Sequence, residues 1–286
     1  MTNTLHIFEM GPRDGLQNEK VLIPTEEKIT LINLLSKSGL KKIESASFVS
    51  PKWVPQMADG AEVLAGITRQ SDVIYSALTP NMKGYERARQ AKADEVAIFG
   101  SASEGFSKAN INCTIEESLE RFKPLVEAAK ADGIPVRGYV SCVIACPYDG
   151  EIAPAQVAKV SRSLLDMGCY EISLGDTIGV GTPETTTHML EAVLQEVPAT
   201  HLAGHFHDTN NMALANIETA LSFGLRVFDA AVGGLGGCPY APGAKGNVNT
   251  LEVVDLAARL GFETGIDRAQ LETAQHFILE LKKAFQ

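Results

Sequence analysis

Short apolar runs alternate along the chain with longer segments in which apolar residues recur every three or four positions. The short runs are typical of strands buried on both faces, and the longer segments are typical of amphipathic helices. Helices are expected between the strands; Thr114 and Pro154, for example, stand where two helices should begin. The predicted strands are Leu5–Glu9, Lys42–Phe48, Val73–Leu78, Glu95–Phe99, Val136–Val140, Tyr170–Leu174, Leu202–His207 and Arg226–Ala231.

Eight strands in strict alternation with helices predict a parallel sheet closed into a (β/α)8 barrel, the TIM-barrel fold. The alternative, an open doubly wound sheet, usually has about six strands and a Gly-x-Gly-x-x-Gly segment after the first strand, which this chain lacks. The segment from Asp267 to Phe285 is expected to form an additional C-terminal helix that packs on the barrel or on a second subunit. Neither a linker nor a repeat is evident, so residues 1–286 are expected to form a single catalytic domain.

Composition and charge narrow the class of function. The chain has 286 residues, of which 45% are hydrophobic, and a net charge of −10. An isoelectric point near 5.1 leaves no basic surface for nucleic acid or anionic lipid. No segment approaches the length of a membrane span, and the N-terminus lacks the features of a signal or transit peptide. The cysteines lack Cys-x-x-Cys spacing and favour a reducing cytoplasm; they are Cys113, Cys142, Cys146, Cys169 and Cys238.

Polar residues gather where the expected strands end. In a (β/α)8 barrel the active site is built from the carboxyl ends of the strands and the loops that follow them. Gly-Pro-Arg-Asp-Gly-Leu-Gln (residues 11–17) follows the first strand, and Glu44 lies in the second. The sixth strand leads to Asp176, the seventh ends in His-Phe-His-Asp (residues 205–208), and a glycine-rich segment ending at Asn247 follows the eighth. We therefore expect these side chains at one rim of the barrel.

A metal site is predicted around the histidine pair. Alternate residues of a strand face the same side, so His205 and His207 should both point into the barrel while Phe206 points to the helices. The alternative is a pair of core or rim histidines without a metal ion. Asp14 could add a carboxylate and Asn247 an amide oxygen. Such a mixed nitrogen and oxygen set without thiolate favours Mg²⁺ or Mn²⁺ over structural zinc.

Four further residues are candidates for catalysis, each with a structural alternative. Arg13 forms either a rim salt bridge with Asp14 or a fixed cation that stabilises an enolate or carboxylate oxygen. Glu44, in a strand interior, needs a buried partner such as Arg13. Asp176 is either a helix N-cap or a group close to a ligand. Cys238 lies among five glycines between residues 233 and 243, and it is either a proton donor or acceptor or an ordinary small apolar residue.

Together these residues resemble 3-hydroxy-3-methylglutaryl-CoA lyases, within a wider group of metal-dependent barrel lyases and synthases. The resemblance runs from about Gly11 to Gly265. The motifs that carry it are Gly-Pro-Arg-Asp-Gly-Leu-Gln-Asn-Glu-Lys, Ser-Phe-Val-Ser-Pro-Lys-Trp-Val-Pro-Gln-Met, Asn-Ile-Asn-Cys, Gly-Tyr-Val-Ser-Cys, Glu-Ile-Ser-Leu-Gly-Asp-Thr-Ile-Gly-Val-Gly-Thr-Pro, His-Phe-His-Asp-Thr and Gly-Gly-Leu-Gly-Gly-Cys-Pro-Tyr-Ala. It implies the metal ligands Asp14, His205, His207 and Asn247. It also implies catalytic roles for Arg13, Glu44, Asp176, His205 and Cys238.

The implied reaction is a retro-Claisen cleavage of 3-hydroxy-3-methylglutaryl-CoA to acetoacetate and acetyl-CoA, as in leucine degradation and ketone-body formation. A divalent Mg²⁺ or Mn²⁺ ion would acidify the 3-hydroxyl group of the substrate. Arg13 would stabilise the thioester enolate, and Cys238 would protonate it. Either Asp176 or His205 would be the base that takes the hydroxyl proton.

The resemblance also implies contacts to the acyl-CoA substrate. Lys108 and Asn110 are expected to touch the CoA part, and a homodimer is expected. At two places, however, the chain differs from the usual sequence of the family. Asn210 and Asn211 stand where the family usually has an aromatic or similar residue and then Gly; because Asn tolerates a positive φ, the turn is expected to persist. Residues 248–251, Val-Asn-Thr-Leu, replace the usual Ala-Thr-Glu-Asp and so remove acidic residues near a predicted ligand.

Two other functions remain open. A related barrel can work in the condensing direction, as an isopropylmalate- or homocitrate-type synthase. Such synthases usually carry Gly-Glu-Arg-x-Gly-Asn where this chain has Pro-Gly-Ala-Lys-Gly-Asn (residues 242–247), and they often have extra C-terminal domains. An inactive barrel acting as a binding protein would be expected to have lost ligands, whereas all four predicted ligands are present.

Overall fold

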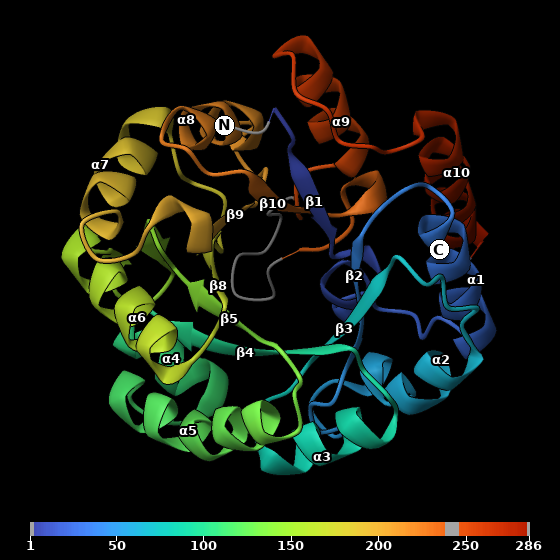
Figure 1. The fold of residues 1–286 in the computed structure, drawn as a ribbon, viewed down its shortest axis with the longest axis horizontal. Coiled ribbons are helices and arrows are strands. Elements are labelled where there is room, and N and C mark those ends of the chain that lie inside the picture. The colour runs from blue at the N-terminus through green and yellow to red at the C-terminus, as the bar shows by residue number, and fades with distance from the viewer. Residues whose placement is uncertain (1–2, 238–245, 285–286) are drawn as a thin grey trace.

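A closed parallel barrel forms the centre of the molecule. The structure is a computed structural model that describes residues 3–237 and 246–284. In these residues eight parallel strands close in the order β1-β2-β3-β4-β5-β8-β9-β10, with β10 pairing back to β1 (Figure 1). The predicted (β/α)8 fold is confirmed, and every expected strand is present with its ends within two residues of the prediction. The barrel strands are β1 His6–Glu9, β2 Lys42–Ser47, β3 Ile74–Leu78, β4 Glu95–Ser101, β5 Val136–Ser141, β8 Glu171–Asp176, β9 Leu202–Phe206 and β10 Val227–Ala230.

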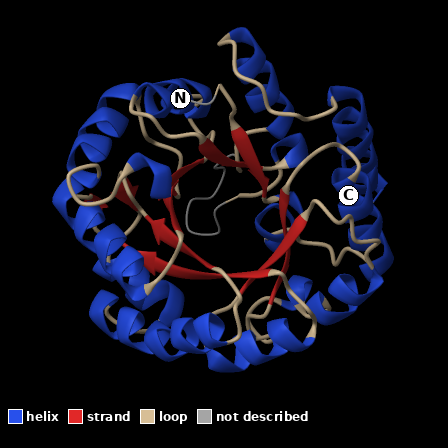
Figure 2. Cartoon of the chain, viewed as in Figure 1, coloured by secondary structure: helices blue, strands red, loops and turns tan. Residues whose placement is uncertain are grey.

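Helices cover the outside of the barrel on all sides (Figure 2). The predicted C-terminal helix is present as α10, and it packs against α1 and α9 of the same chain (Figure 1). In the described part of the chain, no helix is long and apolar enough to cross a membrane. The helices are α1 Thr25–Ser36, α2 Gly60–Gly66, α3 Met82–Gln90, α4 Glu104–Ile111, α5 Ile115–Ala131, α6 Pro154–Met167, α7 Pro183–Val193, α8 Ala213–Ser222, α9 Thr250–Arg259 and α10 Arg268–Ala284.

The helix boundaries follow from local chemistry. Thr114 caps α5: its side chain accepts the backbone N–H of Glu117, whose own side chain accepts the N–H of Thr114. Pro154 opens α6, and Gly168 ends it in the left-handed region with φ 119°. Some elements of the described chain were not predicted, besides short 3-10 and π-helical turns. These are α4 and the antiparallel hairpin of β6 (Ala145–Cys146) and β7 (Gly150–Glu151).

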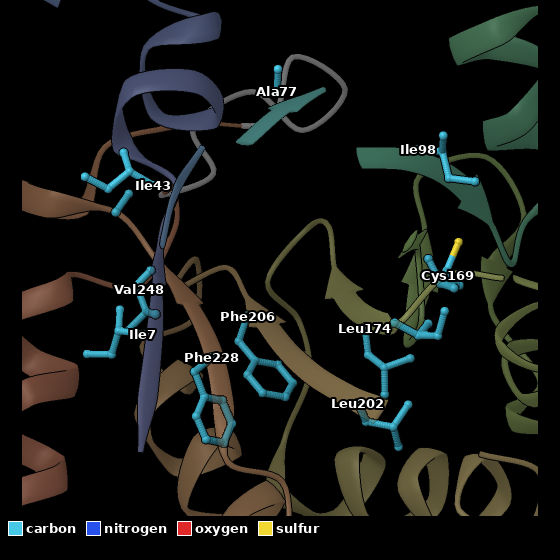
Figure 3. Packing of buried hydrophobic residues seen from close by; sticks show 14 of the residues in the cluster. Ile7, Ile43, Ala77, Ile98, Cys169, Leu174, Leu202, Phe206, Phe228 and Val248 are labelled. Carbon is cyan, nitrogen blue, oxygen red and sulfur yellow. The ribbon is translucent and has the colours of Figure 1, made fainter. Parts of the chain in front are cut away.

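Apolar side chains pack in two layers. The larger layer lies between the barrel and the helices, and Figure 3 shows part of it, including Phe206 and Phe228. A Cβ at Gly204 would lie 2.7 Å from the Phe206 ring, so these rings need a glycine there. Burying a Phe side chain stabilises the fold by about 2 kcal/mol. A smaller cluster lies on the inward faces of the strands and comprises Phe8, Met10, Leu78, Ala97 and Tyr139.

Candidate active site

A short π-helix places two charged residues at the carboxyl end of β1. It spans Gly11–Gly15 and contains Arg13 and Asp14. Single π-helical turns are frequent at functional sites because they redirect side chains without ending the chain's hydrogen bonding. The turn is fixed by Glu9, whose Oε1 accepts the backbone N–H groups of Gly11 at 2.8 Å and Val232 at 2.9 Å. The segment after β1 and the segment after β10 are therefore joined through one buried carboxyl group.

Arg13 is held between two carboxylates. Its Nε donates to Glu44, as predicted, and its Nη1 donates to Asp14 Oδ1 at 2.6 Å. The other Glu44 oxygen accepts the Tyr139 hydroxyl at 3.1 Å. Burial disfavours the charged guanidinium, but the charges of Glu44 and Asp14 outweigh it and raise the pKa of Arg13. Among the described residues, Nη2 of Arg13 has no hydrogen-bond partner, so one nitrogen of a fixed cation remains for a ligand.

The predicted metal-side residues come together. One ligand atom each of Asp14, His205 and His207 can be chosen so that all lie within 4.8 Å of one another. The two Nε2 atoms are 3.3 Å apart. Asn247 joins them, because its Nδ2 donates to Asp14 Oδ2 at 2.8 Å. Phe206 packs in the outer apolar layer, as the alternation predicted.

Two of the three candidate ligands have protonation states that fit a divalent cation. Burial disfavours a charge on the third, His205, but Asp229 outweighs burial and raises the pKa of His205, so this ring must release a proton before it binds an ion. Burial opposes ionisation of Asp14, but Arg13 and the two histidines outweigh it, and the pKa of Asp14 falls to about 2. Burial and the neighbouring His205 lower the pKa of His207 to about 4. A carboxylate and a neutral imidazole are the forms that bind metal ions. In addition, Oδ1 of Asn247 is buried without a hydrogen-bond partner among the described residues, as expected of an oxygen available for an ion.

Close backbone packing brings Asn247 to this position. Gly236 has φ 120°, and a Cβ there would lie 2.8 Å from Asn247 Nδ2. A Cβ on Gly246 would lie 2.6 Å from the Cα of Gly236, so only glycines allow this approach. Gly236 also lines a neighbouring cleft of about 480 Å³, whose walls include Lys20 and Lys282.

The remaining predicted residues contribute no ligand atom to this cluster, although the backbone carbonyl of Asp176 accepts the N–H of His207 at 3.4 Å. Asp176 is fully buried, and its carboxylate accepts the backbone N–H groups of Gly181 at 2.8 Å and Val180 at 3.3 Å, in the loop after β8. Burial raises its pKa. Lys108 and Asn110 are exposed on α4, outside the buried cluster. The prediction for Cys238 falls outside the described residues.

The departures from the family pattern have local roles. Asn211 adopts φ 58°, so the turn after β9 persists as predicted. Asn249 caps α9, because its side chain accepts the backbone N–H of Leu251. Thr250 donates its hydroxyl to Glu9 Oε2 at 2.7 Å. The replaced residues therefore support the segment that carries Asn247.

The sequence analysis missed three residues that lie beneath the rim, namely Arg137, Tyr139 and Asp229. Arg137 is fully buried and forms ion pairs with Glu171 and Asp229, and Asp229 in turn contacts His205. Tyr139 joins Arg137 to the Arg13 side of the site. A signal was available, because Arg137 and Asp229 are charged residues in strands whose other positions are mostly apolar, as Glu44 is.

Comparison with known proteins agrees with this geometry. The HMGL-like family model matches residues 4–278. The chain belongs to this family. It is 60% identical to mitochondrial hydroxymethylglutaryl-CoA lyase of Bos taurus over 274 residues, which cover 96% of this chain and 84% of the relative.

Solved structures of other family members share the fold closely. A crystal structure of the HMG-CoA lyase from Brucella melitensis is similar with a TM-score of 0.96 and 60% identity, covering 98% of this chain and 99% of that one. A structure of an HMG-CoA lyase from Acinetobacter baumannii in complex with coenzyme A and 3-methylmalate has a TM-score of 0.94 and 40% identity, covering 98% of this chain and 92% of that one.

Proposed function

We propose that this chain is a lyase that cleaves 3-hydroxy-3-methylglutaryl-CoA to acetoacetate and acetyl-CoA. The observation that carries the proposal is the buried cluster of Asp14, His205 and His207, with the fixed cation of Arg13 beside it, at the mouth of the barrel. Relatives 60% identical to this chain are named for this lyase activity, and one 40% identical is solved with coenzyme A.

The donor set of the cluster fits Mg²⁺ or Mn²⁺. We propose Asp14, His205, His207 and Asn247 as the residues that hold the ion, because they offer oxygen and imidazole donors without thiolate. When bound, such an ion supplies a Lewis acid that lowers the pKa of a hydroxyl group.

Arg13 is proposed to stabilise the negative charge that the cleavage creates. The 3-hydroxyl loses its proton, the C2–C3 bond breaks, and its electron pair moves into the thioester as an enolate. Acetoacetate leaves, and protonation of the enolate carbon gives acetyl-CoA. Glu44 fixes the guanidinium from one side, so the remaining nitrogen is preorganised for the enolate oxygen.

His205 is the better placed of the two candidate bases. Both carboxylate oxygens of Asp176 accept backbone N–H groups of its own loop, which supports a role in shaping that loop. His205, by contrast, contacts Asp229 through Nδ1 and presents Nε2 to the cluster. Because Nε2 is the atom that would take either a proton or a metal ion, His205 can be the base only while its Nε2 does not bind the ion, and Asp176 stays the alternative base when it does. Cys238 remains our proposed proton donor to the enolate.

Several broader expectations stay proposals. We keep Lys108 and Asn110 as contacts for the CoA part, since both are exposed on α4 at the same end of the barrel as the cluster. We also propose one catalytic domain over residues 1–286, a homodimer, and a role in leucine degradation and ketone-body formation. The cytoplasm is the proposed location; relatives are named for both the cytoplasm and the mitochondrion.

The direct test is product analysis with the purified, chelator-treated protein. With Mg²⁺ or Mn²⁺ restored, the wild type should release acetoacetate and acetyl-CoA in equal amounts from 3-hydroxy-3-methylglutaryl-CoA, and the chelated protein should not. A folded, metal-loaded protein that leaves this thioester intact would refute the proposal. Release of free CoA from acetyl-CoA and a 2-oxo acid would instead indicate the condensing reaction.

A further inference from the structure

A buried carboxylate beneath the cluster contacts one of its histidines. Asp229 lies on β10 opposite His205 on β9, and it is 1% exposed. Its Oδ2 is 3.1 Å from Nδ1 of His205. The other ring nitrogen, Nε2, faces His207 in the cluster. One imidazole therefore joins Asp229 below to the candidate metal site above.

Asp229 is surrounded by hydrogen-bond donors. Arg137 donates from Nη2 to Oδ1 at 2.7 Å and from Nη1 to Oδ2 at 3.0 Å. Ser173 donates its hydroxyl to Oδ2 at 2.7 Å. Because both of its oxygens already accept these donors, Asp229 meets His205 as a hydrogen-bond acceptor.

This contact determines which nitrogen of His205 carries the proton. A carboxylate can only accept, so Nδ1 must donate an N–H to Asp229. In the neutral ring, Nε2 then carries the lone pair, and that lone pair points into the cluster. The opposite tautomer would set a lone pair of Nδ1 against a carboxylate, which is repulsive, and would place an N–H on Nε2 where a bound ion needs a lone pair.

We propose that Asp229 is a positioning residue that fixes the tautomer and ring orientation of His205 for metal binding, an inference that rests on the metal site proposed above. Arg137 holds Asp229 in place by a bidentate ion pair, the geometry in which a guanidinium fixes a carboxylate most strictly. Carboxylates that orient a metal-binding imidazole in this way raise its affinity for the ion.

The same arginine reaches the other half of the site. Arg137 Nη1 also donates to the Tyr139 hydroxyl at 3.1 Å, and this hydroxyl donates to a Glu44 oxygen at 3.1 Å. The other Glu44 oxygen accepts a hydrogen bond from Arg13. Arg137 thus fixes His205 through Asp229 and Arg13 through Tyr139 and Glu44. A second ion pair of Arg137, with Glu171 at 2.8 Å, provides a comparison, because it touches neither half of the site.

The test compares Asp229→Asn with Glu171→Gln. Each variant replaces one carboxylate partner of Arg137 by an amide, and only the first one alters the contact to His205. Mn²⁺ binding to the protein without substrate, followed by electron paramagnetic resonance, should weaken about ten- to a hundredfold in Asp229→Asn and change less than about twofold in Glu171→Gln. Equal Mn²⁺ affinity in the wild type and Asp229→Asn, or equal losses in both variants, would overturn the inference.

A second measurement needs no variant. In the metal-free wild type, ¹⁵N shifts of labelled histidine at a pH where the rings are neutral should show His205 protonated at Nδ1. Protonation at Nε2 would overturn the inference even if Asp229→Asn fails to fold. Both measurements test the inference separately from the proposed function, because neither the His205 tautomer nor the Mn²⁺ affinity of the variants is measured through turnover. If both agree with the inference and the wild type still fails to cleave the thioester, only the proposed lyase activity is refuted.

Discussion

Glu9 should make the stability of the protein depend on pH in a specific window. Burial raises the pKa of Glu9 from 4.5 to about 7, although Thr250 and two backbone N–H groups oppose the shift. The folded state therefore binds the proton more tightly than the unfolded chain does. The stabilisation is fully present below about pH 4.5 and is lost as the pH rises through 7. A difference of about 2.5 pH units corresponds to about 3 kcal/mol of unfolding free energy.

Glu9→Gln should remove this dependence. The amide oxygen can still accept the N–H groups of Gly11 and Val232, and the amide nitrogen can donate to the Thr250 hydroxyl. Urea unfolding at pH 5 and pH 8 should show the wild type losing about 2.5 kcal/mol relative to the variant between the two values, because the stabilisation is already slightly reduced at pH 5. Glu120→Gln, which removes an exposed carboxylate, controls for the loss of one charge. Parallel curves for the wild type and Glu9→Gln would refute the argument.

Three further predictions test the proposed site. Arg13→Lys should lower kcat about a hundred- to a thousandfold with little change in KM, because an ammonium cannot replace the guanidinium held by Glu44; a loss confined to KM would contradict the enolate role. His207→Ala should weaken Mn²⁺ binding in equilibrium dialysis at least about tenfold, whereas Phe206→Leu should lower only stability; full Mn²⁺ occupancy in His207→Ala would exclude it as a ligand. Cys238→Ser should lower kcat by about two orders of magnitude or more with unchanged Mn²⁺ affinity, and an unchanged kcat would show that another group protonates the enolate.

The barrel was predictable because its determinants are local. Strands buried on both faces give uninterrupted apolar runs, and helix ends carry residues such as Thr114 and Gly168 that satisfy the chain's own hydrogen bonds. The hairpin of β6 and β7 was not predictable, because strands of two residues each are too short to form a pattern. For α4 the apolar periodicity is weak, and its start depends on Ser103, which caps it through a side-chain contact.

The sequence predicted which residues form the site better than it predicted which of them contact each other. Parallel strands of a barrel end at one rim, so His205, Asp14 and Asn247 could be expected to meet. The partners of Asp229 could not be deduced, because Arg137 lies 92 residues away in the sequence and several buried carboxylates compete for it. Asp176 illustrates the same difficulty. The sequence left it as either a helix N-cap or a group close to a ligand; in the structure Thr182 caps α7, and the Asp176 carboxylate binds the loop before that helix.

The charges within this network bear on how an acidic protein can accept an acidic thioester. When its carboxylates are ionised, the part of the network at the candidate ligands has three negative groups, Asp14, Glu44 and Asp229, and two positive groups, Arg13 and Arg137, so a bound divalent cation would reverse the sign of its net charge. Without the cation, a CoA thioester with a free carboxylate would meet net negative potential at the mouth of the barrel. At the proposed metal site the cation would therefore serve substrate binding as well as chemistry, and the apparent affinity for substrate should fall along with kcat when the metal is removed.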